Sequence, residues 1–316
     1  QKVARKCYLP ANELILKLIN KLQGQFRLTY SISGTALDQF AKYAPDVIKS
    51  FQRLARTGCV EFLSETYNHS LAFQYSKEEF KAQVDKHKQK IKELFNYEPK
   101  VFRNTELIYN NELAQLVEQM GYKAVLSEGV DHILGWRSPN FVYKPKGTEH
   151  IKLLLKNYKL SDDIAFRFSN HAWPEWPLTA DKYVKWLNQV NGNGYVVNLF
   201  MDYETFGEHQ WESTGIFDFL EAIPEKFLQN PDNNFKTLSE VVDLYPVSDE
   251  IDIQHPVSWA DKERDVSAWM GNRIQHNALN ELYILEKQVK QANDQNLLAD
   301  WQKLTTSDHF YYMSTK

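Results

Sequence analysis

The sequence predicts an α/β fold in which strands alternate with helices, followed by a helical C-terminal part. Short apolar runs of strand length recur between longer segments that have the apolar spacing of amphipathic helices. This alternation is typical of a parallel sheet, either doubly wound or closed into a barrel. After about residue 215 the spacing is helical alone. At 316 residues the chain can bury one large core with a smaller attached part.

The first part of the chain contains two strands among three helices. Apolar and polar residues alternate at 26–32, which indicates a strand, and Gly58 precedes a second apolar run at 59–63. Helical spacing surrounds these runs, at 12–22, 35–56 and 76–95.

Four more strands are expected, which makes six. The run at 195–200 is apolar throughout, as is typical of strands that a parallel sheet buries on both faces. The other three strands are expected at 101–102, 123–126 and 151–155. Helices are expected at 111–120, 179–190, 217–222, 238–244 and 261–289. The longest irregular region, 131–177, has the length of loops that carry binding functions.

Composition narrows the possible partners and compartment. The chain has 37 Lys plus Arg against 41 Asp plus Glu, so it lacks the basic excess that binds a phosphate backbone, and nucleic acid is not an expected partner. No run approaches the roughly 20 apolar residues of a membrane-spanning helix, so no membrane partner is expected either. The two cysteines are too few for a disulfide framework. Cytoplasm is therefore the expected location.

Three clusters of acidic and aromatic residues follow predicted strands, where α/β folds place their active sites. They occupy 61–70, 102–110 and 201–209. If the strands are parallel, all three clusters face the same rim. Two of the acids, Glu106 and Asp202, could act as the paired carboxylates of glycosidic cleavage, although they lie far apart in sequence.

Other chemistries are less well supported by these residues. Carboxylates and an imidazole in the third cluster could bind a divalent metal, but the spacing of Asp202, Glu204, Glu208 and His209 matches no tight metal signature. The sequence has no Gly-rich phosphate loop followed by Lys and no Gly-x-Ser-x-Gly elbow. Nucleotide and acyl chemistry are therefore not expected.

At four short motifs the sequence resembles glycoside hydrolase family 57, specifically its α-amylase-type members. The motifs are GCVEF at 58–62, FRNTE at 102–106, MDYETFG at 201–207 and SDHFYY at 307–312. The resemblance implies that Glu106 is the nucleophile and Asp202 the general acid/base.

The resemblance also implies a fold and its division. It implies a seven-stranded (β/α) barrel over residues 1–212, followed by a helical bundle over 213–316 that completes the active site. The six strands expected from the apolar runs are one fewer than the seven that the resemblance implies. The family's opening His-Gln-Pro motif does not occur, and we expect that residues upstream of this sequence supply it, so the barrel in this chain is incomplete.

Further substrate-binding residues are implied by the resemblance. Glu61, Glu204 and Asp308 would line the substrate site. The remaining assignments by resemblance are Tyr67, His69, Arg103, His209 and Tyr311. Trp173 and Trp176 would form a platform for a sugar ring or would pack in the core.

The function expected from these residues is retaining cleavage of α-1,4-glucosidic bonds in glycogen, starch or maltodextrin, with no metal or cofactor. The expected partner is an α-glucan, and the oligomeric state is left open. Three alternatives remain: a 4-α-glucanotransferase or branching enzyme, a catalytically silent glucan-binding homologue, and a metal-dependent polysaccharide deacetylase with a metal ion among Asp202, Glu204 and His209.

Overall fold

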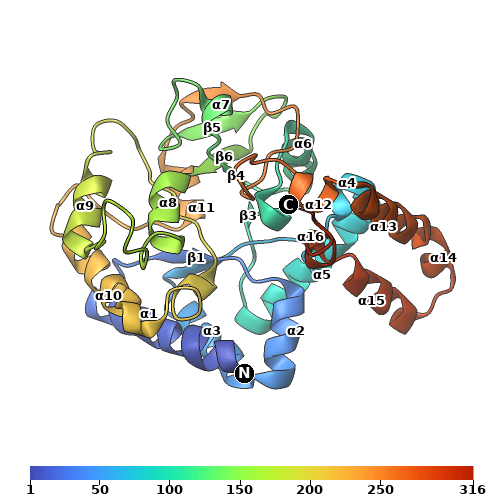
Figure 1. The fold of residues 1–316 in the computed structure, drawn as a ribbon, viewed down its shortest axis with the longest axis horizontal. Helices are drawn as coiled ribbons and strands as arrows, with labels where there is room; N and C mark the ends of the chain where they lie inside the picture. Colours follow the sequence, from blue (N-terminus) through green and yellow to red (C-terminus); the bar gives the residue numbers. More distant parts are fainter. Residues whose placement is uncertain (316) are drawn as a thin grey trace.

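Five short strands run parallel to one another in chain order (Figure 1). They are β1 (Leu28–Tyr30), β2 (Val60–Phe62), β3 (Val101–Phe102), β4 (Ala124–Glu128) and β6 (Lys152–Lys156). The computed structural model describes residues 1–315. It pairs β1 with β2 in one sheet and β3, β4 and β6 in a second sheet. A single parallel bridge between Ser64 and Phe102 joins the two sheets.

The second sheet has two further strands that the sequence did not predict. Strand β5 (Val142–Pro145) runs antiparallel to β6, and β7 (Asp249–Ile251) pairs in parallel with β5. The order in this sheet is therefore β3-β4-β6-β5-β7. Strand β5 lies within the region 131–177 that we expected to be irregular.

The strand expected at 195–200 does not form, and that expectation is wrong. The segment makes only one parallel bridge, from Asn198 to Lys156 at the end of β6. None of its side chains is buried. Within residues 1–315 no backbone pairing joins the segment to β1, so one side of it lacks the ladder that would make it a strand.

The expected helix at 35–56 is two helices, because a proline cannot continue a helix from the preceding turn. Pro45 is at the start of the second helix, after Ala44 with an extended φ of −152°. The helices of the N-terminal half are α1 (Leu9–Lys21), α2 (Gly34–Tyr43), α3 (Pro45–Ala55), α4 (Ala72–Tyr75), α5 (Lys77–Phe95), α6 (Asn111–Gln119) and α7 (Asp131–Leu134). A π-helical turn, Ala4–Tyr8, precedes α1.

Of the later helices, some pack near the strands and others project away from them. Helix α10 (Ile216–Phe227) packs against α1 and α9, and α11 (Leu238–Leu244) packs against β4. Helices α13, α14 and α15 project away from the strands (Figure 1). The other helices and their bounds are α8 (Tyr158–Ala165), α9 (Ala180–Asn188), α12 (Ser267–Met270), α13 (Arg273–Ile284), α14 (Glu286–Gln291), α15 (Gln295–Leu304) and α16 (Ser307–Tyr311).

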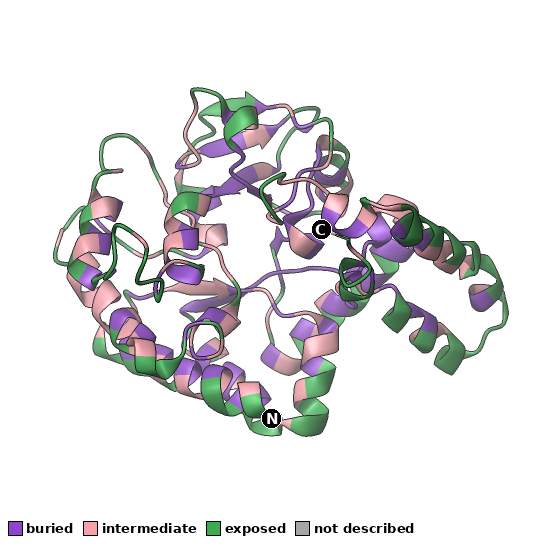
Figure 2. Ribbon diagram, viewed as in Figure 1, coloured by how far each residue is buried: buried purple, intermediate pink, exposed green. Residues whose placement is uncertain are grey.

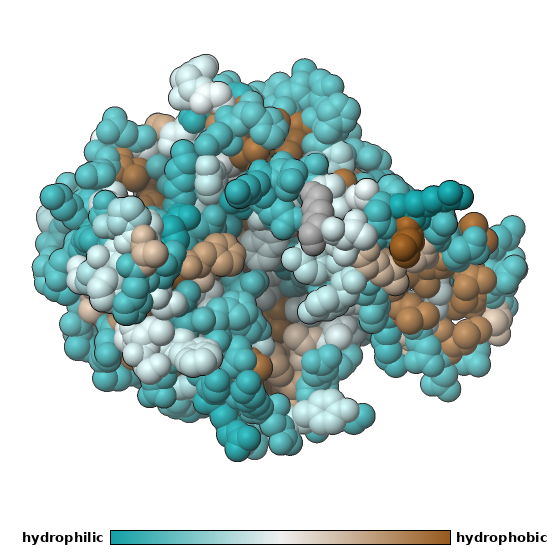
Figure 3. Space-filling model, viewed as in Figure 1, coloured by the Kyte–Doolittle hydropathy of each residue, from teal (hydrophilic) through white to brown (hydrophobic). Residues whose placement is uncertain are grey.

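Burial follows this arrangement. Figure 2 shows that buried residues concentrate on the strands and on the inner sides of the surrounding helices. Phe102 of β3 is fully buried in the largest core cluster. Figure 3 shows an apolar patch on the part of the surface formed by the projecting helices. Apolar residues exposed on or between these helices are Ile274, Ile284, Leu285, Leu297 and Leu304. No helix within residues 1–315 is long and apolar enough to cross a bilayer.

Candidate active site

A cavity of about 1700 Å³ receives side chains from the segments that follow β2, β3 and β6. Its lining includes Glu106 after β3 and Asp202 after the segment 195–200. The structure therefore brings the two carboxylates to one cavity, although they are distant in sequence. Both follow the carboxyl ends of segments that align in parallel, which is where α/β folds gather functional side chains.

Glu106 has an unusual backbone and a carboxylate held by three donors. Its φ is +58°, in the left-handed region that non-glycine residues seldom adopt, and such residues cluster at functional sites. Oε1 accepts from His69 Nε2 at 3.1 Å and from Ser307 Oγ at 3.3 Å. Oε2 accepts from Trp259 Nε1 at 2.7 Å. The carboxylate is thus fixed in orientation before any substrate arrives.

His69 lies between two carboxylates. Its Nδ1 is 3.2 Å from Oε2 of the buried Glu65, and Arg103 Nη1 lies 3.7 Å from the same oxygen. Burial alone would lower the pKa of His69, but its hydrogen bonds to Glu106 and Glu65 raise that pKa to about 9. Burial alone would raise the pKa of each carboxyl, but His69 and then Arg103 hold the pKa values of Glu65 and Glu106 at about 2. The histidine is therefore cationic and both acids are ionised at neutral pH.

These pKa displacements predict how stability depends on pH. The contribution of the protonated His69 is complete below pH 6.5 and is lost as the pH rises through 9, while that of Glu65 and Glu106 is lost as the pH falls from 4.5 through 2. Between pH 6.5 and 9, each unit by which the pH rises is therefore expected to lower the free energy of unfolding by up to about 1.4 kcal/mol through this one group.

Urea unfolding of the wild type and of His69→Gln, each measured from pH 6 to pH 9.5, checks this prediction. The wild type is expected to lose stability more steeply than the variant, in which the titrating group is absent. Buried His87 has a lowered pKa because of desolvation, and it is common to both proteins, so the comparison cancels its contribution. Equal slopes in the two proteins would contradict the prediction.

Asp202 has the opposite electrostatic environment from Glu106. Desolvation in the cavity, the negative charge of Glu204 and, to a smaller extent, that of Glu106 raise its pKa. The last contribution shows that the two carboxylates lie within range of each other's field. Two carboxyl groups whose surroundings displace their pKa values in opposite directions can serve as a base or nucleophile and an acid.

The loop that carries Asp202 is held by the start of the chain. Tyr8 donates its hydroxyl proton to Glu204, and Tyr203 donates to Asn12 Oδ1 at 2.7 Å. Gly207 has a φ of +114°, and a Cβ placed there would lie 2.0 Å from the carbonyl oxygen of Lys6, so only glycine fits. His209 lines the cavity near this loop, and its backbone N–H donates to the Glu204 carbonyl at 2.8 Å.

The C-terminal motif reaches the same cavity. Asp308 and Tyr311 of α16 both line it. The helix is fixed there because Ser307 donates its backbone N–H to the His69 carbonyl at 2.9 Å, next to an antiparallel bridge between Ser70 and Thr306. Of the residues implied by the resemblance, the cavity thus gathers His69, Arg103, Glu106, Asp202, Glu204, His209, Asp308 and Tyr311.

Among residues 1–315, Glu61 and Tyr67 do not line this cavity, so their substrate-binding roles stay predictions. Glu61 is within β2, ahead of the strand's carboxyl end, and accepts the Ser239 backbone N–H at 3.0 Å at the start of α11. Tyr67 packs its ring on Gly34 and donates to Asp38 Oδ2 at 2.8 Å. Both side chains therefore fasten a helix to its neighbours.

The two tryptophans considered for a sugar platform, Trp173 and Trp176, lie apart from the two carboxylates. Trp173 does not line the cavity within the described residues, and it packs edge-on against Trp186 with ring centroids 6.1 Å apart. Trp176 is exposed and stacks on His171 at 4.1 Å. Both belong to the region around α9 rather than to the carboxylate site.

Sequence reasoning missed three residues that contact the site. Glu65 stood in the first acidic cluster, four residues after Glu61, and the rule that sites lie beyond strand ends would have favoured it. Trp259 and Ser307 reach Glu106 from the C-terminal part, and no local pattern marks Trp259. Among residues 1–315, no group of three or more His, Cys, Asp or Glu side chains is arranged to hold a metal ion.

Known proteins resemble the chain in both sequence and fold. It is 44% identical over 327 aligned residues to a Methanocaldococcus jannaschii protein named "Putative alpha-amylase". The alignment covers all of this chain and 68% of that protein. The structure superposes on a Pyrococcus horikoshii GH57-type branching enzyme with a TM-score of 0.77 at 13% identity, covering 98% of this chain and 80% of that one.

A second similar structure is the 4-alpha-glucanotransferase of Thermococcus litoralis, with a TM-score of 0.69 at 18% identity. The similarity covers 90% of this chain but only 43% of the transferase, so the chain spans less than half of that enzyme. At these identities both superpositions compare folds alone. Residues 1–254 match the family model of Glycosyl hydrolase family 57, and the chain therefore belongs to glycosyl hydrolase family 57.

Proposed function

We propose that the chain cleaves α-1,4-glucosidic bonds of a glucan with retention of configuration, using Glu106 as nucleophile and Asp202 as general acid/base. The observation that carries the proposal is the pair of carboxyl groups at one cavity with opposite pKa displacements. Family membership and the amylase name of the 44% identical relative support the reaction class and the substrate.

The reaction proceeds in two displacements. Glu106, ionised, attacks the anomeric carbon while Asp202 gives its proton to the departing glycosidic oxygen. A glycosyl ester with Glu106 forms as the glucosidic bond breaks. Asp202, now ionised, then takes a proton from an incoming water, whose oxygen displaces Glu106 and releases the sugar. Two inversions restore the original configuration.

The hydrogen bonds at Glu106 suit this sequence of events. Ionised Glu106 is stabilised by His69, Arg103 and the Trp259 indole, which keep it ready to attack at neutral pH. The charge that Glu106 loses on forming the ester lowers the field at Asp202, whose pKa then falls. Asp202 thereby changes from acid to base between the two steps.

Transfer to a second sugar instead of water is the alternative that a specific observation favours. The cavity of about 1700 Å³ is large enough for an acceptor sugar beside the donor, and two structural relatives carry the names of a glucanotransferase and a branching enzyme. A sugar hydroxyl would replace water in the second displacement.

Product analysis on maltoheptaose tests the proposal. Hydrolysis yields only shorter oligomers, while transfer also yields longer ones, and both require turnover by the wild type. The absence of any product would support the catalytically silent glucan-binding homologue and contradict the proposal. Proton NMR of the first products reads the anomeric configuration, and release of the β-anomer would exclude retention.

The finer description of the fold and its division belongs to the same proposal. A seven-stranded (β/α) barrel over residues 1–212 would place the parallel segments in consecutive order around the cavity. The bridges from Ser64 to Phe102 and from Lys156 to Asn198 support that order. In this arrangement the part over 213–316 contributes Trp259 and Asp308 to the cavity, and Ser307 donates to the Glu106 carboxylate.

A further inference from the structure

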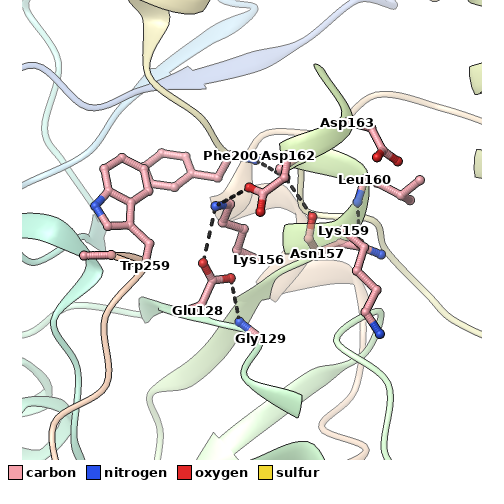
Figure 4. Close-up of polar contacts among 12 residues, drawn as sticks. Glu128, Gly129, Lys156, Asn157, Lys159, Leu160, Asp162, Asp163, Phe200 and Trp259 are labelled. Carbon is pink, nitrogen blue, oxygen red and sulfur yellow. Dashed lines mark hydrogen bonds and ion pairs between the residues drawn. The ribbon is translucent and has the colours of Figure 1, made fainter. Parts of the chain in front are cut away.

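A second group of charged side chains lies beside the site and has no part in the two displacements. Glu128 ends β4, Lys156 ends β6, Asp162 is on α8 and Arg264 comes from the segment after β7. Figure 4 shows Lys156 between Glu128 and Asp162, close to Trp259. The Lys156 Nζ is 3.3 Å from Glu128 and 3.5 Å from Asp162. Two acids and two bases, all largely buried, thus balance in charge.

Arg264 connects this charged group to a loop. Its Nη1 is 3.0 Å from Glu128 Oε2, and its Nη2 is 3.2 Å from Asp162 Oδ2. Nη1 also donates to the backbone carbonyl of Trp259 at 2.6 Å. The loop closes on itself because Ser258 donates its backbone N–H to the Arg264 carbonyl at 3.0 Å. A guanidinium can make these contacts together because its donors form a rigid fork.

The loop that Arg264 holds bears directly on Glu106. Trp259 donates its indole N–H to the Glu106 carboxylate at 2.7 Å and its backbone N–H to the Glu106 carbonyl at 3.3 Å. An antiparallel bridge between Tyr109 and Val257 aligns the two segments next to these bonds. The Lys156 Nζ lies 5.3 Å from the centre of the Trp259 ring, within the range of a cation–π contact.

We propose that Arg264 is a positioning residue for the reaction: bound to Glu128 and Asp162, it fixes the loop 258–264 and so holds the Trp259 indole against Glu106. This inference rests on the proposed role of Glu106 as nucleophile. A cluster that served folding alone would leave the protonation and reactivity of Glu106 unchanged once charge balance was kept.

The test therefore removes the link while keeping the charges balanced. Arg264→Met alone would leave two buried acids facing only Lys156, which is expected to destabilise the fold. The double variant Arg264→Met/Glu128→Gln leaves Lys156 matched with Asp162. Position 128 keeps an oxygen for the Gly129 N–H, which the native glutamate accepts at 3.0 Å.

In the double variant we expect a thermal midpoint close to that of the wild type and a kcat on maltoheptaose lower by about 10- to 100-fold, the scale of a lost hydrogen bond to a charged group. KM is expected to change little. The acid limb of the pH profile of kcat/KM is expected to move to higher pH, because the Glu106 anion loses a donor.

Two further variants make the test specific. Trp259→Phe removes the indole N–H directly. When it is combined with the double variant, the loss of kcat is expected to be no larger than that of Trp259→Phe alone, because both changes act on the same bond. Arg137→Met is the matched control, since Arg137 also binds an acid, Asp249 at 3.3 Å, and the backbone carbonyl of Glu250 at 2.9 Å, but makes no bond to the site. Wild-type kcat and pH profile are expected for it.

The outcomes separate this inference from the proposed function. Activity retained in Glu106→Gln would overturn the proposed function. If Glu106→Gln is inactive but the folded double variant keeps the wild-type kcat and acid limb, the positioning role of Arg264 is wrong. If the double variant does not fold, Arg264→Lys is measured instead, because lysine keeps the charge but cannot bind both acids and the carbonyl together. An unmoved acid limb in Arg264→Lys would overturn the inference.

Discussion

Replacing Glu106 by glutamine is expected to lower kcat for glucan cleavage by on the order of 10⁴-fold or more, because the amide cannot form the glycosyl ester. The fold is expected to survive, since His69 retains its bond to Glu65 at 3.2 Å and the amide oxygen can still accept from Trp259. Steady-state rates on maltoheptaose measure the effect. Glu78→Gln, at an exposed glutamate, is the control for the same chemical change.

Chemical rescue distinguishes a lost nucleophile from general damage to the site. In Glu106→Ala the vacated space admits azide, which can attack the anomeric carbon directly, so a single inversion yields the β-glucosyl azide. A Glu106→Ala protein that produced the α-glucosyl azide would contradict the assignment, because that product requires a glycosyl ester on another residue. Proton NMR identifies the anomer.

Replacing Asp202 by asparagine is expected to have an effect that depends on the leaving group. With maltoheptaose, whose leaving alkoxide must be protonated, kcat/KM is expected to fall by about 10²- to 10⁴-fold. With a 2,4-dinitrophenyl maltoside the leaving group departs without a proton, and the first step is expected to change far less. The alkaline limb of the pH profile, which reports the raised pKa of Asp202, is expected to disappear.

Asp243→Asn serves as the control for this second substitution, since Asp243 is exposed and binds only Lys123 at the surface among the described residues. In Asp202→Ala, azide is expected to capture the glycosyl ester on Glu106 and give the α-glucosyl azide, the opposite anomer from Glu106→Ala. An equal loss of kcat/KM, which reports the first step, on both substrates would show that Asp202 does not act as the proton donor.

The sequence alone predicted the strands that pair with a parallel neighbour. Apolar runs predicted β1, β2, β3, β4 and β6, and all five are present. The apolar run at 195–200 led to a wrong strand prediction, because a strand also needs a neighbour to pair with. Among residues 1–315, only Asn198 of this segment makes a bridge to another strand. Pro45 divided a helix that apolar spacing alone predicted to be continuous.

The candidate site residues that lie within short motifs could be proposed from the sequence. The family resemblance, inferred from four short motifs, is confirmed by the match over residues 1–254. The motif containing Glu61 did not reveal that Glu65, four residues later, is the carboxylate that binds His69, since a motif does not state which residue lies beyond the strand's end. Trp259 was not predictable, because its contact with Glu106 depends on tertiary packing between segments about 150 residues apart.

The backbone segments that lead to the two carboxylates of the cavity are anchored very differently, and this has a dynamic consequence. The segment carrying Glu106 is pinned by the Tyr109 to Val257 bridge and by Trp259, whereas the segment leading to Asp202 has one bridge, at Asn198. Local opening costs least where few backbone bonds must break, so amide hydrogen exchange should be faster around residue 198 than around residue 107. In the proposed reaction the segment around Glu106 would stay fixed, while the segment 195–200 ahead of Asp202 could adjust, within the limit set by the Tyr8 and Tyr203 hydrogen bonds that hold the loop after Asp202.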